Sequence, residues 1–348
     1  MKKGVIGKKD LGAWVEKLKK EGELVGPKKR TDQFFYFDRI GDPMELALDY
    51  TSTILPPKKF FMAPKGELML DFNLKTGAAS AAKGEPAREL ILFGVHACDM
   101  QGLLRLDLCW KEGNPDAAYL QKRAKSAMIG ITCNPDEYCF CSKVSSNDFR
   151  EGFDLFLSDL GTSYLAEAFT AKGEKLLALA KTTEAGLLED ELAYKAKHKC
   201  ASERGAEFMP KVAELPLLCM NGEDLDFWTA DVGRRCLACG ICTNVCPTCY
   251  CFDVEDTVDL NLTTGRRTRR WDSCQLEGFT EVAGGEKFMH DQPTRQKHRF
   301  YRKFRWLTTK FGGQAFCVGC GRCGRQCTAQ ISIPETANKL YQGVKAKA

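Results

Sequence analysis

The spacing of apolar residues predicts alternating strands and helices in the first half of the chain. Residues 11–22 place apolar side chains on one face of a helix that ends at Gly22. Continuous apolar runs at residues 89–95, 126–132 and 153–157 are typical of strands buried on both faces. We expect further strands at residues 33–38, 67–74 and 163–170, helices at residues 100–109 and 173–181, and a surface loop at residues 76–86. This alternation indicates an α/β fold.

A Lys-, Glu- and Ala-rich segment separates this region from the second half. Residues 182–220 are expected to be mostly helical. Cys200 and Cys219 stand alone there, and we expect both to be small buried residues. The chain therefore divides into an α/β domain at residues 1–224 and a second domain at residues 225–348.

Length and composition indicate a globular protein of two or three domains. The chain has 348 residues, of which 44% are hydrophobic and 28% are charged. No apolar run approaches the roughly 18 residues that cross a bilayer, and the first residues lack the apolar core of a signal peptide. We therefore expect a cytoplasmic protein without a membrane span. The formal net charge of +5 carries little weight, because metal–thiolate clusters would add negative charge.

Cysteines form the most specific pattern in the sequence. Among the 18 Cys, two runs share the spacing C-x2-C-x2-C-x3-C, which bacterial ferredoxins use for cubane iron–sulfur clusters. The first run begins at Cys236 and the second at Cys317. Gly240 and Gly321 occupy the same position in the two runs, where the backbone must curl tightly. Zinc favours separated pairs of ligands and fits this spacing poorly, and nothing indicates the secretion that a disulfide framework requires.

The paired spacing predicts two [4Fe–4S] clusters with crossed ligands. In this arrangement the fourth Cys of each run binds the cluster of the other run. The expected sets are Cys236, Cys239, Cys242 and Cys327 for one cluster, and Cys317, Cys320, Cys323 and Cys246 for the other. The alternative is that each run serves its own cluster, since a long insertion at residues 252–312 separates them. We expect the second domain to be α-helical and ferredoxin-like, with two clusters.

Four cysteines of the first domain form a second constellation. Cys98 and Cys133 each follow one of the expected buried strands. If these strands are parallel neighbours, both thiols emerge at the same edge of the sheet, within reach of Cys139 and Cys141 on the next loop. Their spacing is not among the standard cluster runs. It leaves two interpretations open, a third [4Fe–4S] cluster near the surface and structural thiols.

The insertion combines cysteines with cationic residues. Cys249, Cys251 and Cys274 exceed the eight ligands of the two clusters, so we expect them to pack beside the clusters. Residues 264–271 are rich in Arg, and residues 295–306 mix Arg and Lys with aromatic residues. Such stretches can bind nucleic acid. We favour a helix whose aromatic side packs on the cluster domain while its basic side is solvated or docks on a partner, because anionic clusters need cationic neighbours.

Several motifs along the chain occur together in one family. They are Pro56-Pro57-Lys58-Lys59-Phe60, Gly94-Val95-His96-Ala97-Cys98-Asp99, Cys139-Phe140-Cys141, Cys246-Pro-Thr-Cys-Tyr-Cys-Phe-Asp-Val254, Trp271-Asp-Ser-Cys274 and Cys317-Val-Gly-Cys-Gly-Arg-Cys323. In combination they resemble the iron–sulfur subunit family that includes the anaerobic sulfite reductase A subunit and the sulfhydrogenase beta subunit. The resemblance extends from about residue 30 to residue 335.

This resemblance implies an electron-transfer subunit. Members of the family pass electrons between a flavoprotein that handles NAD(P)H and a terminal redox partner, which is a hydrogenase, a sulfite reductase or a heterodisulfide-reductase-like module. The resemblance also implies that Cys98, Cys133, Cys139 and Cys141 hold a cluster, which would bring the total to about twelve iron atoms. Two departures stand out: His96-Ala97 precedes Cys98 where the family has Arg and often Pro, and Thr328 follows Cys327 in place of Pro, for which Pro334 is a partial substitute.

No G-x-G-x-x-G fingerprint follows an expected strand, and the sequence contains no phosphate-binding Walker loop or H-E-x-x-H motif. We therefore expect no flavin or nicotinamide in this chain and no turnover of a substrate by the chain alone. The expected partners are the flavoprotein and the terminal redox subunit in a hetero-oligomer, without nucleic acid. Two alternatives remain: a redox enzyme with its own Cys-lined substrate site, and an iron–sulfur protein that binds nucleic acid.

Overall fold

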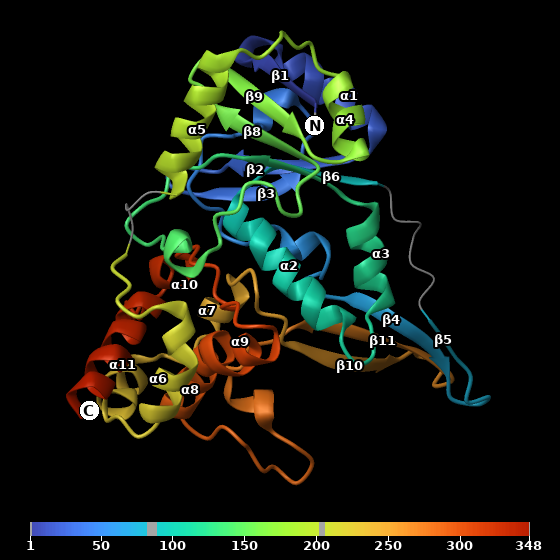
Figure 1. The fold of residues 1–348 in the computed structure, drawn as a ribbon. Coiled ribbons are helices and arrows are strands. Elements are labelled where there is room, and N and C mark those ends of the chain that lie inside the picture. The colour runs from blue at the N-terminus through green and yellow to red at the C-terminus, as the bar shows by residue number, and fades with distance from the viewer. Residues whose placement is uncertain (1, 82–88, 202–205, 348) are drawn as a thin grey trace.

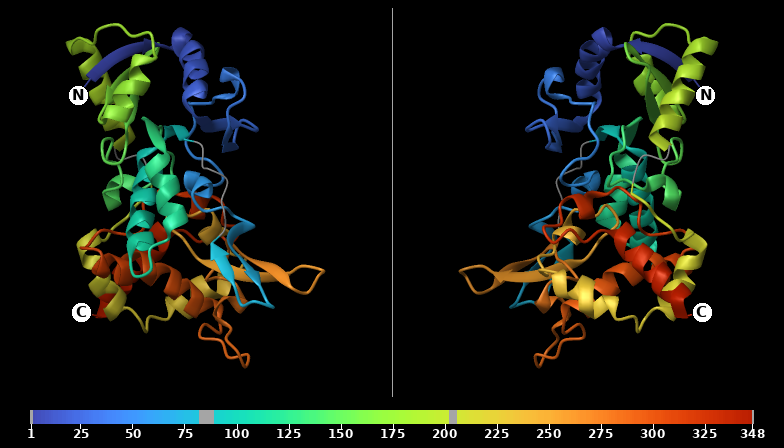
Figure 2. Two further views of the ribbon diagram at one scale, coloured as in Figure 1. Left: turned by 90° about the vertical axis from the view of Figure 1, so that its right-hand side faces the viewer. Right: turned by 90° about the vertical axis from the view of Figure 1, so that its left-hand side faces the viewer.

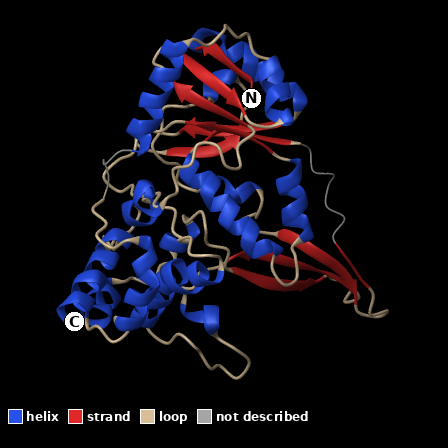
Figure 3. Cartoon of the chain, viewed as in Figure 1, coloured by secondary structure: helices blue, strands red, loops and turns tan. Residues whose placement is uncertain are grey.

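Two β-sheets and a helical region make up the structure (Figures 1 and 3). The computed structural model describes residues 2–81, 89–201 and 206–347. In the view of Figure 1, a seven-stranded sheet lies at the top and a four-stranded sheet extends at the lower right. Helices of the C-terminal part gather at the lower left. The described chain is therefore a mixed α/β structure with a large sheet.

The larger sheet has a parallel centre and antiparallel edges. From one edge to the other, its strands are β1 (Lys2–Gly7), β9 (Ser163–Ala168), β8 (Leu155–Asp159), β7 (Ala127–Ile131), β6 (Leu90–Val95), β2 (Glu23–Lys29) and β3 (Phe35–Arg39). The pairs β2–β6, β6–β7 and β7–β8 are parallel. The pairs β1–β9, β8–β9 and β2–β3 are antiparallel. The expectation that the apolar runs at 89–95 and 126–132 form parallel neighbours is thus confirmed.

Both faces of the central strands are buried, as their continuous apolar runs predicted. Ile91 and Phe93 of β6 lie in one hydrophobic core together with Ile129 of β7. The intervening Leu92 and Met128 lie in a second core on the opposite face. Each such side chain stabilises the fold by about 1.5–3 kcal/mol when it leaves water.

Helices cover the two faces of this sheet. The helices α1 (Leu11–Glu21) and α4 (Ala171–Ala178) complete the first core, and the Trp14 indole of α1 donates a hydrogen bond to the Leu176 carbonyl of α4. The second core is completed by α2 (Ala97–Lys111) and α3 (Ala117–Lys125). A further helix, α5 (Leu187–Ala201), packs beside β8 and β9.

The smaller sheet joins segments that are far apart in the sequence. Its antiparallel strands, in order, are β10 (Phe252–Val258), β11 (Thr264–Trp271), β4 (Glu67–Asn73) and β5 (Ala79–Ala81). Figure 2 shows β4 and the β10–β11 hairpin side by side, projecting from the body of the molecule. This sheet crosses the boundary that we expected between residues 224 and 225.

The C-terminal part surrounds its own hydrophobic core. Trp228, Phe300, Phe304 and Leu340 lie at its centre, together with Phe140 from the first half of the chain. The helices of this part are α6 (Leu215–Asn221), α7 (Ile241–Asn244), α8 (Gln292–Tyr301), α9 (Leu307–Lys310), α10 (Arg322–Arg325) and α11 (Ile333–Lys347), with π-helical turns at Trp228–Gly233 and Arg302–Trp306. The expectation of an α-helical second domain is incomplete, because the insertion also contains the β10–β11 hairpin.

Two further expectations differ from the structure. The loop expected at 76–86 contains the short strand β5, and its residues 82–86 lie outside the described part. The segment 182–220 is interrupted between α5 and α6, where residues 206–211 are not helical. Within the described ranges, no helix is both long enough and apolar enough to cross a bilayer.

Candidate iron–sulfur centres

The two cysteine runs follow the same backbone path. Gly240 has φ +75° and directly precedes α7, and Gly321 has φ +71° and directly precedes α10. At the third position of each run, Ala238 and Gly319 also have positive φ. A Cβ on Gly321 would stand 2.7 Å from backbone atoms of Tyr138, so only glycine fits there. The expectation that both glycines serve a tight curl of the backbone is confirmed.

Four cysteines from both runs line one cavity. Its walls include Cys236, Cys239 and Cys242 of the first run and Cys327 of the second. Apolar walls come from Ile241, Leu237, Ala329 and Ile331, and polar walls from Gln275, Gln296 and Arg299. Cys239 is exposed, so the cavity reaches the protein surface. This grouping matches the set that crossed ligation requires.

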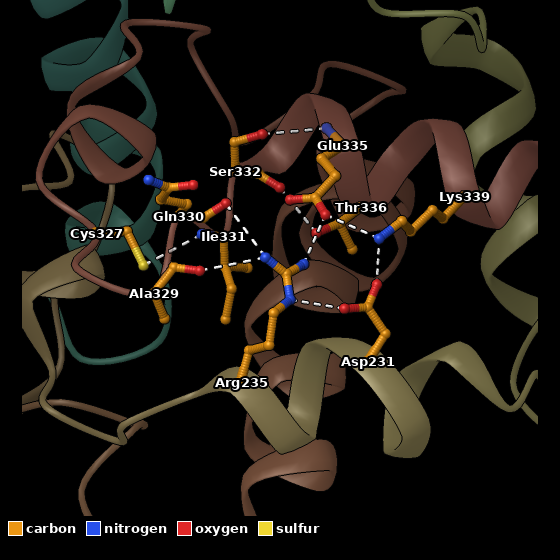
Figure 4. Close-up of polar contacts among 10 residues, drawn as sticks. All are labelled: Asp231, Arg235, Cys327, Ala329, Gln330, Ile331, Ser332, Glu335, Thr336 and Lys339. Carbon is orange, nitrogen blue, oxygen red and sulfur yellow. Dashed lines mark hydrogen bonds and ion pairs between the residues drawn. The ribbon is translucent and has the colours of Figure 1, made fainter.

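A polar network holds the segment after Cys327 next to the first run (Figure 4). Arg235, which directly precedes Cys236, donates hydrogen bonds to the Ala329 carbonyl at 3.2 Å and to the Glu335 carboxylate at 2.6 Å. Its Nε donates to Asp231 at 2.6 Å, and Lys339 pairs with both Asp231 and Glu335. Pro334 lies in the first turn of α11, where its missing amide costs no hydrogen bond. The network thereby links the start of one run to the end of the other.

Amides and side-chain N–H groups are directed at the sulfurs of this cavity. The Ala238 amide donates to Cys236 Sγ at 3.4 Å, and Gln296 Nε2 donates to the same sulfur at 3.0 Å. The Ile331 amide donates to Cys327 Sγ at 3.3 Å. Sulfur donors, N–H groups that point at them and apolar walls are the features of a protein site for a [4Fe–4S] cluster. The residues of this cavity therefore fit that group.

Cys246 of the first run lies beside the second run. The Thr248 hydroxyl donates to the Phe316 carbonyl at 2.6 Å and lies 3.3 Å from Cys246 Sγ, so it connects the two runs. Burial raises the pKa of Cys320 to about 11, an effect that Arg322 opposes and the Cys246 thiol increases. Burial also raises the pKa of Cys317, again with a contribution from Cys246. Cys246, Cys317, Cys320 and Cys323 thus form a second group of interacting thiols.

Two buried cations lie between these thiol groups. Arg299 of α8 and Lys303 of the following π-helical turn are almost fully buried. Burial lowers the pKa of Arg299, but the negative charges of Cys242 and Cys323 act in the opposite direction and raise the pKa overall. Lys303 donates to Cys249 Sγ at 3.3 Å and to Thr248 Oγ1 at 2.7 Å, and its pKa is raised in the same way by Cys246 and Cys249. Both cations therefore offset negative charge at the sulfurs.

These contacts correct our expectation for the basic segment at residues 295–306. We expected its basic side to be solvated or to meet a partner, but Arg295, Arg299 and Lys303 are buried together with its aromatic residues. In the other basic segment, Arg267 pairs with Asp256, and Arg269 pairs with Glu67 and Asp116. These arginines already form ion pairs with carboxylates of the protein, which disfavours a role in binding nucleic acid.

The thiols of the first half lie near the C-terminal ends of the central strands β6 and β7 of the large sheet. Cys98 is in the first turn of α2, directly after β6, and Cys133 follows β7. Cys141 begins a short 3-10 helix, Cys141–Val144. Cys139 Sγ instead donates to the Asp136 carboxylate at 3.3 Å and has Arg325 nearby at 4.0 Å. Cys200, at the end of α5, lies with its sulfur 2.9 Å from Cys133 Sγ, a contact that sequence spacing did not indicate.

This thiol group is packed directly against the second cysteine run. The Phe140 amide donates to the Gly319 carbonyl at 2.7 Å. A Cβ on Gly319 would lie 2.5 Å from the Cys141 amide, so the two backbones touch. Arg322 of α10 makes a buried two-pronged ion pair with Asp99, the neighbour of Cys98, at 2.5 and 2.7 Å.

The surplus cysteines occupy the base of the β10–β11 hairpin and the helical core. Cys251 precedes β10, and its carbonyl accepts from the Asp272 amide across the hairpin at 3.0 Å, near Cys274. The Cys249 carbonyl accepts from the buried Lys58 at 2.6 Å. Cys219 is fully buried in the C-terminal core, as expected for an isolated Cys. In the described ranges, no three His, Cys, Asp or Glu side chains are grouped closely enough for a single metal ion.

Comparison with known proteins supports these observations. Residues 235–331 match a family described as a 4Fe-4S dicluster domain, and this span contains both cysteine runs. The sulfhydrogenase 2 subunit beta of Pyrococcus furiosus is 34% identical to this chain over 338 residues, which are 94% of this chain and 95% of the relative. No solved structure matches the chain.

Proposed function

The chain belongs to the family of sulfhydrogenase beta subunits, and on this premise we propose that it carries electrons between a flavoprotein that handles NAD(P)H and a terminal redox subunit. As an iron–sulfur electron-transfer subunit of a hydrogenase complex, it works in a hetero-oligomer. The similarity to a sulfhydrogenase beta subunit favours a hydrogenase as the terminal partner.

One observation carries the proposal. The cavity lined by Cys236, Cys239, Cys242 and Cys327 adjoins the second thiol group through Arg299, and that group touches the loop of Cys139 and Cys141. Thiol groups therefore follow one another from an opening at Cys239 to the C-terminal ends of the central strands β6 and β7. A relay requires such a continuous arrangement.

We assign the ligands according to this arrangement. Cys236, Cys239, Cys242 and Cys327 would hold one [4Fe–4S] cluster, and Cys317, Cys320, Cys323 and Cys246 a second. Cys98, Cys133, Cys139 and Cys141 would hold a third. When bound, each cluster supplies a centre that accepts and releases one electron. The thiols belong to a C-terminal dicluster domain at residues 225–348 and an α/β domain at residues 1–224.

The protein's own residues prepare these sites. Arg235 ties the Cys327 segment to the first run, which places Cys327 beside the other three thiols of the cavity. Ile331 and Ile241 exclude water from one side of the cavity. Arg299 and Lys303 place positive charge beside the thiols in a medium of low dielectric constant, where charge interactions are strong. The exposed Leu237 and Cys239 leave one rim of the cavity open to a partner.

The flavin and the nicotinamide belong to the partner in this proposal. The G-x-G-x-x-G pattern at residues 319–324 lies within the second cysteine run and follows no strand, so it lacks the context of a dinucleotide fingerprint, and a relay needs none. Cys249, Cys251 and Cys274 support the clusters by packing, and the complex acts in the cytoplasm.

A purification and turnover experiment tests this proposal. The affinity-tagged full chain is isolated anaerobically from its native host, and copurifying subunits are identified by mass spectrometry. We expect a flavoprotein and a second redox subunit, with NAD(P)H-dependent turnover by the complex only. A chain that purifies without partners and turns over NAD(P)H by itself would contradict the proposal.

A further inference from the structure

Two cysteines from distant parts of the first half bring their sulfur atoms into direct contact. Cys133 follows β7 and Cys200 lies in the last turn of α5, 67 positions later in the sequence, yet their Sγ atoms are 2.9 Å apart. Both are free thiols in the structure. Thiols whose side chains face each other at such a distance are within reach of a disulfide bond.

The backbone on both sides of Cys133 is fixed by hydrogen bonds. The Thr132 amide donates to the Leu157 carbonyl of β8 at 3.0 Å. The Asn134 carbonyl accepts from the Thr51 hydroxyl, also at 3.0 Å. The position of the Cys133 sulfur is therefore set by the sheet and by a neighbouring segment.

The helix that carries Cys200 is also anchored to the large sheet. Asp190 of α5 pairs with Lys3 of β1 at 2.6 Å, and Lys197 of α5 pairs with Glu167 of β9. These ion pairs connect the helix to two strands of the sheet. The contact between the two sulfurs is thus a built feature of the fold, because both sides of it are held.

The two thiols differ in their access to solvent. Cys200 is only 4% exposed, whereas Cys133 is partly exposed. Cys133 also lines an open cavity, together with Asn134 and with Ala196 and Lys199 of α5. A small molecule that enters this cavity meets the sulfur of Cys133 first. An accessible thiol beside a buried resolving thiol is the arrangement of redox-sensing cysteines.

We propose that Cys133 and Cys200 form a reversible dithiol–disulfide pair, in which Cys133 is the attacking thiol and Cys200 the resolving thiol. The co-reactant is a low-molecular-weight disulfide. Reversible pairs of this kind occur in reducing compartments, where permanent structural disulfides are rare.

The reaction consists of two thiol–disulfide exchanges. The Cys133 thiolate attacks one sulfur of the small disulfide, so a mixed disulfide forms and one small thiolate leaves. Cys200 then gives up its proton and attacks the Cys133 sulfur, which forms the Cys133–Cys200 bond and releases the second small thiolate. The pair loses two electrons and two protons, and the small disulfide takes them up to become two thiols.

This pair gives the third thiol site a redox control. The proposed function supplies one part of the argument, the iron at Cys133, whereas the disulfide follows from the sulfur contact alone. A sulfur that belongs to a disulfide is no longer the thiolate that binds metal. The oxidised pair and a third cluster therefore exclude each other, and oxidation interrupts the relay at the end that lies in the first half of the chain.

Mass spectrometry of the full chain tests the inference. The chain and its Cys98→Ala variant, which lacks a proposed ligand of the third cluster, are purified anaerobically, and their iron is measured. Both are incubated with graded ratios of oxidised to reduced glutathione, quenched with acid, alkylated under denaturing conditions and digested. We expect about twelve iron atoms in the unmodified chain and about eight in the variant, since each cubane holds four.

The linked peptides decide the outcome. We expect a Cys133–Cys200 disulfide in Cys98→Ala that dithiothreitol reverses, and none in the unmodified chain while it keeps all its iron. The isolated, buried Cys219 is the internal control and should be alkylated as a free thiol throughout. Absence of this disulfide from both chains at every ratio would overturn the inference. Its presence in both, with about eight iron atoms each, would keep the pair and remove the third cluster, while the two C-terminal clusters of the relay stay in place.

Two further variants test the assigned roles, both made in the Cys98→Ala chain. With Cys200→Ser, Cys133 should stop at the mixed disulfide with glutathione, because no resolving thiol follows. With Cys133→Ser, Cys200 should remain a free thiol, because the buried sulfur is not reached from the cavity. A mixed disulfide on Cys200 in the second variant, with a free Cys133 in the first, would contradict this assignment.

Discussion

At the residue scale, the cysteine-rich region contains buried positive charges as well as thiols. Arg299 and Lys303 are buried beside thiols of the C-terminal groups, whereas sequence reasoning placed the basic side of this segment in solvent or against a partner. The cysteine spacing was informative because it is a local pattern, and it correctly predicted that Gly240 and Gly321 have the same backbone geometry. A mixed basic and aromatic run has no comparable local signal, because its partners are the cysteines that it meets only after folding.

Removing the charge of Arg299 should make the C-terminal clusters harder to reduce. In Arg299→Met, the electron that enters a cluster is no longer stabilised by the neighbouring cation. We expect the reduction potential of at least one cluster to fall by about 60 mV, which corresponds to about 1.4 kcal/mol for one electron. EPR-monitored redox titration measures this shift. Arg299→Lys keeps the charge and should stay near the unmodified value, and equal potentials in all three proteins would refute this role.

At the scale of elements, whether a strand could be predicted from the sequence depends on where its stabilising contacts are made. The strands β6, β7 and β8 were predictable because each is buried on both faces and therefore apolar throughout. The β10–β11 hairpin was missed because its strands are largely exposed and charged. Pairs such as Arg267 with Asp256 and Arg269 with Glu67 hold it, and one of these partners lies 202 residues away. The contact between Cys200 of α5 and Cys133 was missed because the two residues lie 67 positions apart in the sequence.

The ion pair between α2 and α10 should be essential to the fold. Asp99 and Arg322 have 0% and 1% exposed side chains, so Asp99→Asn leaves a buried guanidinium without its countercharge. We expect a loss of about 3–5 kcal/mol in stability. Urea unfolding followed by circular dichroism measures the change. The exposed Arg267–Asp256 pair provides the control, since Arg267→Ala should leave the free energy of unfolding nearly unchanged. Equal effects of the two substitutions would contradict the structural role of the buried pair.

At the scale of the whole molecule, the chain brings sulfur groups of both halves into contact. The second cysteine run touches the loop of Cys139 and Cys141, and the smaller sheet joins β4 to β11. These contacts join segments from both halves of the chain. An electron carrier benefits from such continuity, because the sites must keep fixed positions relative to one another.

The central claim is that this chain relays electrons and does not itself oxidise NAD(P)H. The most direct test is anaerobic mixing of the isolated, iron-loaded chain with NADH or NADPH, while the visible absorbance of its clusters is followed. We predict no bleaching with the nucleotide alone and rapid bleaching once the purified flavoprotein subunit is added. Bleaching by the nucleotide in the absence of any flavoprotein, or flavin retained in stoichiometric amount by the isolated chain, would contradict the account.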